Sequence, residues 1–245
     1  MPNPHDVGTA RLLESMGFAA LATTSSGFAT SIGRLDMSVE REAVLSHVVE
    51  GVRAVEVPVN VYSERCFADD LDGIKETVRM IAETGAAGFS LEDWNPQAGE
   101  IDPFDEAVGR VGAAAEAASE SGIVLTARCE HHLHGIDDLD ATIERLVAYR
   151  DAGADVVYAP GLASLTDIGR VVSETAVPVS VLILPGGPSV GELAGAGVRR
   201  ISTGGMLASA AYGASVALAS TLQSDGVIDP SAPWLDRKLS AKAFG

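Results

Sequence analysis

Short apolar runs alternate with longer amphipathic stretches along the whole chain, and this alternation predicts strands that alternate with helices. The predicted strands cover residues 18–23, 57–62, 87–91, 123–127, 155–159, 177–183 and 198–202. The predicted helices cover residues 7–16, 38–54, 71–84, 104–121, 137–151, 164–174, 189–195 and 206–222. A Gly-Ala or Ala-Gly pair often precedes the next strand, as in AETGAAGFSLED, and suits the left-handed turn that ends a helix.

Strands that alternate with helices form a parallel sheet with right-handed crossovers. We therefore predict one α/β domain over residues 1–245, a (β/α)8 TIM-type barrel. Such a barrel needs one more strand before the first helix, and only the four residues MPNP are available for it. The first strand is then a truncated stub, unless the chain is trimmed or began upstream. An open doubly wound sheet is the competing fold, but no GxGxxG motif follows the first strands.

Composition and charge disfavour some classes of binding partner and favour one cellular compartment. The chain is 47% hydrophobic and has a formal net charge of −17, which disfavours nucleic acid and anionic membranes as partners. No apolar run reaches the ~18 residues that span a bilayer, and no secretory signal is evident. With only two cysteines, Cys66 and Cys129, a disulfide framework is not expected, so we expect a cytoplasmic protein.

The active site of such a barrel lies at the carboxyl ends of the strands. Arg128 follows the apolar strand IVLTA, where a guanidinium can hold a carboxylate through two hydrogen bonds, or form a buried ion pair with Glu92 or Glu130. Glu64 and Glu92 end neighbouring strands and can share Mg²⁺, or pair with Arg65 and Arg128.

Four further features carry weaker signals. The run TTSSG at 23–27 suits an oxyanion but is also common loop material. The histidines of EHHLHG match no standard zinc spacing, so a solvated loop is favoured over a metal site. Cys129 has no evident activating base and is expected to fill the core. The glycine-containing end of the last strand, STGG at 202–205, suits a phosphate ester as an alternative ligand.

The ordered segments ARLLESMGFAALATTSSGFATSIGRLD, GAAGFSLED, LTAR, AGADVVYAPG and GVRRISTGG resemble the isocitrate lyase/phosphoenolpyruvate mutase superfamily, and this resemblance covers nearly the whole chain. It is closest to the phosphonomutase-like group, also called carboxyvinyl-carboxyphosphonate phosphorylmutase-like. The resemblance implies a (β/α)8 barrel whose last helix is exchanged between subunits, in a homodimer or homotetramer. It also implies a small 2-oxo, 2-hydroxy or phosphono acid as substrate, and an enolate bound to Mg²⁺.

The resemblance also implies roles for single residues. Asp36 matches the family's active-site aspartate, Glu92 the glutamate that holds metal-bound water, and Arg128 the arginine that binds the substrate's acid group. Ser180 stands where an asparagine is common and is expected to contact the substrate. The residues that match the substrate-carboxylate loop are Thr24, Ser25, Ser26 and Gly27.

The segment YSERCFA at 62–68 departs from the family pattern. Tyr62 stands where a carboxylate directly ligates Mg²⁺, and a phenol with a pKa near 10 is a poor ligand for a hard cation. Glu64 keeps the second carboxylate, Arg65 adds positive charge, and both family glycines are lost. Mg²⁺ then binds weakly through Glu64 and Glu92, or Arg65 replaces it, or catalysis is lost. Tyr62 can act as a general acid if its phenol points into the pocket.

Together these observations predict a lyase or decarboxylase-like enzyme for a small 2-oxo or 2-hydroxy mono- or dicarboxylic acid, acting through an enolate-type intermediate. The alternatives are a non-catalytic or metal-independent acid-binding homologue, and an enzyme that acts on the C–P bond of a phosphonate.

Overall fold

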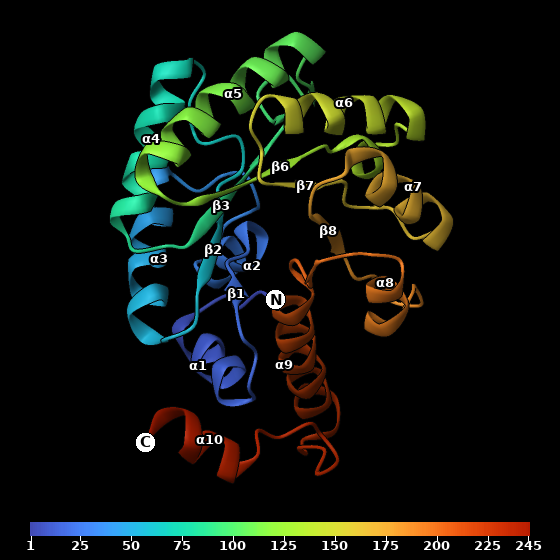
Figure 1. The fold of residues 1–245 in the computed structure, drawn as a ribbon. Helices are drawn as coiled ribbons and strands as arrows, with labels where there is room; N and C mark the ends of the chain where they lie inside the picture. Colours follow the sequence, from blue (N-terminus) through green and yellow to red (C-terminus); the bar gives the residue numbers. More distant parts are fainter.

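The computed structural model describes residues 1–245 and shows a nearly closed barrel of seven parallel strands surrounded by helices (Figure 1). In the order of the sheet these strands are β1 (Leu21–Ala22), β2 (Val59–Tyr62), β3 (Gly88–Glu92), β6 (Val124–Arg128), β7 (Val156–Tyr158), β8 (Val179–Leu182) and β9 (Arg200–Ser202). Every predicted strand is present, and every neighbouring pair is parallel. The predicted TIM-type barrel is confirmed.

Residues 1–3 lie in the gap between β9 and β1. The backbone nitrogen of Met1 donates to the Ile201 carbonyl at 2.8 Å, and that of Ala22 donates to the Pro2 carbonyl at 3.0 Å. The side-chain nitrogen of Asn3 adds a bond to the Thr23 carbonyl at 2.8 Å. The short N-terminal segment therefore occupies the eighth position of the barrel, as the truncated first strand was expected to do.

All eight predicted helices are present, and further elements join them. The α-helices are α1 (Val7–Ser15), α2 (Ser25–Ser31), α3 (Arg41–Ala54), α4 (Leu71–Glu83), α5 (Phe104–Ser121), α6 (Leu139–Asp151), α7 (Leu165–Thr175), α8 (Val190–Gly195), α9 (Met206–Asp225) and α10 (Arg237–Phe244). The 3-10 helix η1 (His131–His134) and the hairpin of β4 (Trp94–Asn95) and β5 (Glu100–Ile101) complete the fold. The sequence did not predict α2, α10, η1 or the hairpin.

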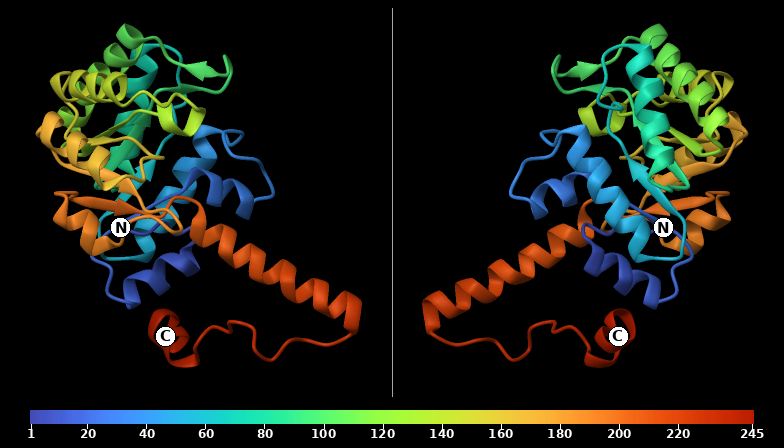
Figure 2. Two further views of the ribbon diagram at one scale, coloured as in Figure 1. Left: turned by 90° about the vertical axis from the view of Figure 1, so that its right-hand side faces the viewer. Right: turned by 90° about the vertical axis from the view of Figure 1, so that its left-hand side faces the viewer.

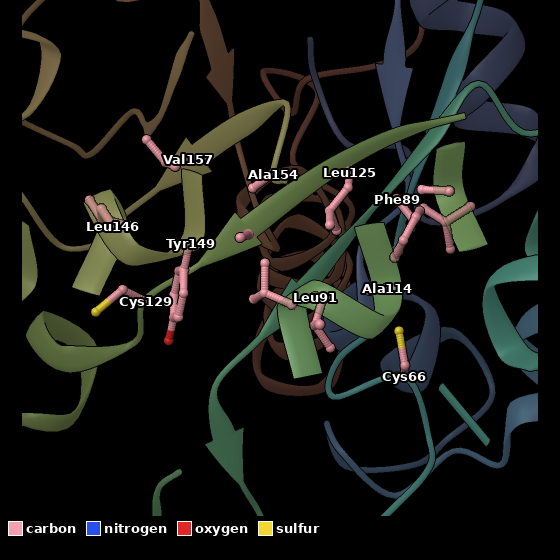
Figure 3. Close-up of a cluster of buried hydrophobic side chains, with 14 of the residues drawn as sticks. Cys66, Phe89, Leu91, Ala114, Leu125, Cys129, Leu146, Tyr149, Ala154 and Val157 are labelled. Atoms are coloured by element: carbon pink, nitrogen blue, oxygen red, sulfur yellow. The ribbon is translucent and has the colours of Figure 1, made fainter. Parts of the chain in front are cut away.

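The outer face of the barrel packs against the helices and forms the main core. Phe89 and Leu91 of β3, Leu125 of β6 and Val157 of β7 lie in one buried cluster with Ala114 of α5 (Figure 3). Alternate strand residues point inward, and many of these are polar or charged, among them Asn60, Ser90, Thr126, Arg128 and Ser180. The inside of the barrel is therefore a polar layer that ends at the mouth of the strands.

Helix α9 projects away from the barrel, and the chain then returns so that α10 packs on α1 (Figures 1 and 2). Most of α9 is exposed, including the apolar side chains of Tyr212, Val216 and Leu222. No helix of the chain is both long enough and apolar enough to cross a bilayer.

Candidate active site

Arg128 lies at the centre of a buried ion cluster at the end of β6. Its Nη1 lies 3.2 Å from a Glu92 carboxylate oxygen, and its Nη2 donates to Glu130 at 2.9 Å. The Nε of Arg128 also donates to Glu130, so that Glu130 occupies one whole edge of the guanidinium. The alternative interpretation, a buried ion pair with Glu92 or Glu130, is confirmed with both partners. Part of the Nη1–Nη2 edge remains for a further acceptor, because only Glu92 shares it.

Two tyrosines lie beside this guanidinium inside the barrel. The Cζ atom of Arg128 lies 5.8 Å from the ring centroid of Tyr62 and 5.4 Å from that of Tyr158. The Tyr158 hydroxyl is 3.3 Å from the Ser202 hydroxyl, and the backbone nitrogen of Tyr62 donates to Thr23 Oγ1 at 2.9 Å. Tyr62 thus points inward next to Arg128, where the expected general acid would have to lie.

The loop after β2 holds Glu64 in an unusual backbone conformation. Glu64, Cys66 and Phe67 have φ values of 49°, 59° and 51°, although none of them is glycine. A left-handed conformation costs about 1–2 kcal/mol for a residue with a side chain. This loop therefore follows a path that glycine would adopt more easily, and the strain is compensated elsewhere.

Two buried arginines supply that compensation. Arg65 binds Asp102 through Nε at 2.8 Å and Nη2 at 2.9 Å, and its Nη2 also reaches Glu106 at 2.8 Å. Arg110 of α5 donates to the carbonyls of Arg65, Ala68 and Asp69 at 2.8, 2.7 and 3.1 Å. The hypothesis that Arg65 replaces a metal ion is wrong, because its guanidinium is bound on the side of α5. The expected pairing of Arg65 with Glu64 is absent for the same reason.

A cavity of about 420 Å³ opens beside this loop, between the segment 37–42, the segment 64–69 and the tip of the β4–β5 hairpin. Glu64 lines it together with apolar side chains such as Met37, Val39 and Phe67. This volume is sufficient for a small organic acid or for part of one.

The two carboxylates at the strand ends do not behave as ordinary surface acids. Burial and the nearby charge of Asp36 raise the pKa of Glu64 to about 7. Burial also raises the pKa of Glu92, and this outweighs the lowering caused by Arg128. Asp36 itself is exposed on the loop before α3, but its charge acts on both glutamates, so the structure brings the predicted Asp36, Glu64 and Glu92 to the same mouth.

No group of three or more His, Cys, Asp or Glu side chains converges on one point at this mouth. Of the two glutamates expected to hold Mg²⁺, Glu92 is bound to Arg128. Mg²⁺ in proteins is usually held through one or two carboxylates, with water and substrate oxygens completing its shell. Of the two strand-end carboxylates, Glu64 is the one that no arginine engages.

The TTSSG segment is partly a helix, which corrects the expectation of a loop. Thr24 is the N-cap of α2, and its hydroxyl accepts a hydrogen bond from the backbone nitrogen of Gly27 at 3.2 Å. The Thr24 hydroxyl also lies 3.2 Å from the Ser26 hydroxyl. Ser25 begins this helix, and Ser26 and Gly27 line a groove against α9. Ser180 lies in the middle of β8, beside Tyr158 and Arg200, and therefore deeper in the barrel than the mouth.

Two weaker expectations also change. The side chains of His131 and His132 are buried and lie 3.1 and 3.2 Å from the Thr142 hydroxyl, so the predicted solvated loop is wrong for this part of η1. The backbone nitrogens of Thr203 and Gly204 already donate to Asn3 Oδ1 at 2.8 and 3.0 Å, which removes the N–H groups of the phosphate alternative. Cys129 is fully buried in the core, as predicted.

Sequence reasoning missed the residue that connects the site loops. Asp93 accepts hydrogen bonds from the backbone nitrogen of Glu130 at 2.8 Å, from Arg145 at 3.2 Å and from the Tyr149 hydroxyl at 2.6 Å. It directly follows Glu92 in the chain, so it fixes both partners of Arg128. The only sequence signal was the unusual placement of two acids after an apolar strand.

The parallel barrel with an arginine–carboxylate cluster at its strand ends agrees with the isocitrate lyase/phosphoenolpyruvate mutase superfamily. Within it, residues 1–223 match the model of the phosphoenolpyruvate phosphomutase family, so the chain belongs to that family.

Relatives of known structure or curated activity agree with this assignment. A Burkholderia cenocepacia J2315 protein provisionally described as a lyase/mutase is 44% identical, with a TM-score of 0.93 over 98% of this chain and 88% of that one. A 2,3-dimethylmalate lyase is 25% identical, with a TM-score of 0.85 over 99% of this chain and 88% of that one. An oxaloacetate decarboxylase from Rhodopseudomonas palustris (strain BisA53) is 32% identical over 143 residues, 56% of this chain and 47% of the relative.

Proposed function

We propose that this protein is a lyase that cleaves a small 2-oxo or 2-hydroxy carboxylic acid through an enolate, without a metal ion bound by the protein. The Arg128 cluster carries the proposal, because it presents a guanidinium edge beside a carboxylate that favours its protonated form. The names of the relatives support it, since a 2,3-dimethylmalate lyase and an oxaloacetate decarboxylase both act on small acids.

In this mechanism Arg128 holds the substrate carboxylate through the part of its Nη edge that Glu130 leaves free. In a 2-oxo acid with a hydroxyl at C4, ionised Glu64 takes the hydroxyl proton, C4 leaves as the carbonyl carbon of an aldehyde, and the electron pair of the C3–C4 bond passes to C3. Conjugation with the C2 carbonyl then places the new charge on the oxygen at C2. Neutral Glu92 donates a hydrogen bond to that oxygen, and the Tyr62 phenol lies on the same side of Arg128. Glu64, which faces the cavity and is now protonated, then returns its proton to C3.

A thermal-shift experiment with oxalate, a planar mimic of the enolate, tests the acid site. Oxalate at about 100 times its dissociation constant should stabilise the protein by about 2.7 kcal/mol, and adding Mg²⁺ should change this little. The variant Arg128→Lys should lose most of the oxalate-induced shift, because an ammonium cannot offer the planar edge. The variant Arg170→Lys, on the exposed face of α7, is the matched control and should keep it.

The two parts of the proposal, the acid site and the independence from metal, are tested separately. An oxalate shift that needs Mg²⁺ would overturn metal independence but keep the acid site. No shift under either condition would overturn the acid site itself. Isothermal titration of Arg128→Lys distinguishes lost binding from a merely less stable fold.

We also propose that the protein is a homo-oligomer in which α9 of one copy packs on another. A groove of about 590 Å³ lies beside β9, and its lining includes Leu13, Met16, Phe18 and Val190. Helix α9 begins at the edge of this groove but projects away from it (Figure 2). An apolar helix and an apolar groove on one chain complement each other when two copies meet.

Size-exclusion chromatography with light scattering tests this arrangement. The wild-type protein should elute as a dimer or tetramer at about 10 μM, an ordinary concentration for an obligate interface. The variant Val216→Asp places a charge on the exposed face of α9 and should shift the population to monomers, whereas Gln223→Asp on the same helix should not. A monomeric wild-type protein would contradict the proposal.

A further inference from the structure

The cavity next to Glu64 is lined by more negative than positive side chains. Its lining includes the carboxylates Glu40, Glu42, Glu64 and Asp69, together with two arginines. Exposed Asp36 adds a further negative charge that acts on Glu64. Most of the remaining lining residues are apolar, and the two polar ones, Ser38 and Gln97, carry no charge.

Both arginines of the cavity already have carboxylate partners. Arg41 lies 3.1 Å from Glu42 and also donates to Thr77, while Arg65 is bound by Asp102, Glu106 and Asp69. Arg34, on the neighbouring loop, donates to the Ser38 carbonyl and forms no ion pair. Arg34 is not part of the lining, so no unpaired arginine or lysine lines the cavity.

The Glu64 side chain has no partner in the folded protein. The residue is only 7% exposed and lines the cavity, yet no hydrogen bond and no positive charge offsets its burial. Glu40, at the N-cap position of α3, makes no side-chain capping bond either. A buried ionised carboxylate without a partner is costly, so a ligand that supplies a donor at this point would be favoured by the ionised form of Glu64.

We propose that the substrate carries a neutral hydrogen-bonding group or, preferably, an ammonium group on the end that enters this cavity, and not a second carboxylate. The inference rests on the proposed function, since it assumes that Arg128 holds the single acid group. Glu64 and Glu40 then receive the donor at the distal end. A second carboxylate there would meet Glu40 and ionised Glu64, and this like charge costs binding even at the effective dielectric of a protein surface.

Three stable four-carbon 2-hydroxy acids test this specificity: malate, 2,4-dihydroxybutanoate and 4-amino-2-hydroxybutanoate. They share the acid and hydroxyl groups at one end and differ in the group at C4, which is negative in malate, neutral in the diol and positive in the amine. Titration calorimetry on the wild-type protein should rank the amine tightest and malate weakest, with a difference of about tenfold or more between them. Oxalate is titrated in the same buffer to report the acid site alone.

Variants then assign the preference to the cavity. Glu40→Gln and Glu64→Gln should each reduce the amine-to-malate ratio several-fold, while Glu144→Gln, on the exposed face of α6, should leave it unchanged. If oxalate binds but malate binds as tightly as the amine, the inference is overturned and the proposed function stands. If oxalate does not bind, both are overturned. A ratio that is insensitive to Glu40→Gln and Glu64→Gln also overturns the inference.

Discussion

Replacing Glu64 by glutamine should stabilise the protein at pH 8 by about 3 kcal/mol and should have little effect at pH 5. Burial raises the pKa of Glu64 from 4.5 to about 7, so the folded protein holds a proton that the unfolded chain has released between these values. The stability of the wild-type protein therefore falls as the pH rises from about 4.5 to about 7. Glutamine fills nearly the same volume and carries no charge to be buried.

Urea denaturation of wild-type protein and Glu64→Gln at several pH values between 5 and 8 measures this effect. The difference in the free energy of unfolding should grow across this range and level off above pH 7, once Glu64 is fully ionised. Glu144→Gln, exposed on α6, is the control and should show a small and pH-independent difference. A destabilising and pH-independent effect of Glu64→Gln would instead show that the Glu64 carboxylate has a partner in the folded state.

The barrel was predictable because its signals are local and repeated. Each predicted strand is a short apolar run between amphipathic helices, and each of these survives in the structure. Helix α2 was missed because it spans only seven residues, which is too short for a periodic hydrophobic pattern. In addition, a threonine such as Thr24 is common both in loops and at helix N-caps. The hairpin β4–β5 was missed because its strands have two residues each.

The candidate site was predictable in position but not in pairing. The rule that active sites lie at strand ends correctly brought Glu64, Glu92 and Arg128 to one mouth, with Asp36 nearby. It could not show which arginine faces that mouth, because the direction of a loop side chain depends on distant partners. For Arg65 those partners are Asp102 and Glu106, 37 and 41 residues further along the chain.

Arg110 is the residue on which the conformation of the Glu64 loop most depends, and Arg110→Met should destabilise the protein by about 3–5 kcal/mol. Its side chain is among the most deeply buried in the chain and donates to three carbonyls of the loop. Methionine fills similar space but leaves those carbonyls without a donor, and a buried unpaired polar group costs about 1–3 kcal/mol. The loop also loses the bonds that offset its three left-handed residues.

A general loss of stability alone would not distinguish this role from ordinary core packing, so the decisive measurement is the coupling to Glu64. Once the loop relaxes, Glu64 should reach water, and its pKa should return towards 4.5. In the Arg110→Met background, Glu64→Gln should then give much less than the stabilisation at pH 8 that it gives in the wild-type protein. Arg79→Met on the exposed side of α4 is the control, and the full effect of Glu64→Gln should persist there. Full persistence in Arg110→Met as well would show that the strained loop holds its shape without Arg110, and that Arg65 with Asp102 is sufficient to place Glu64 at the cavity.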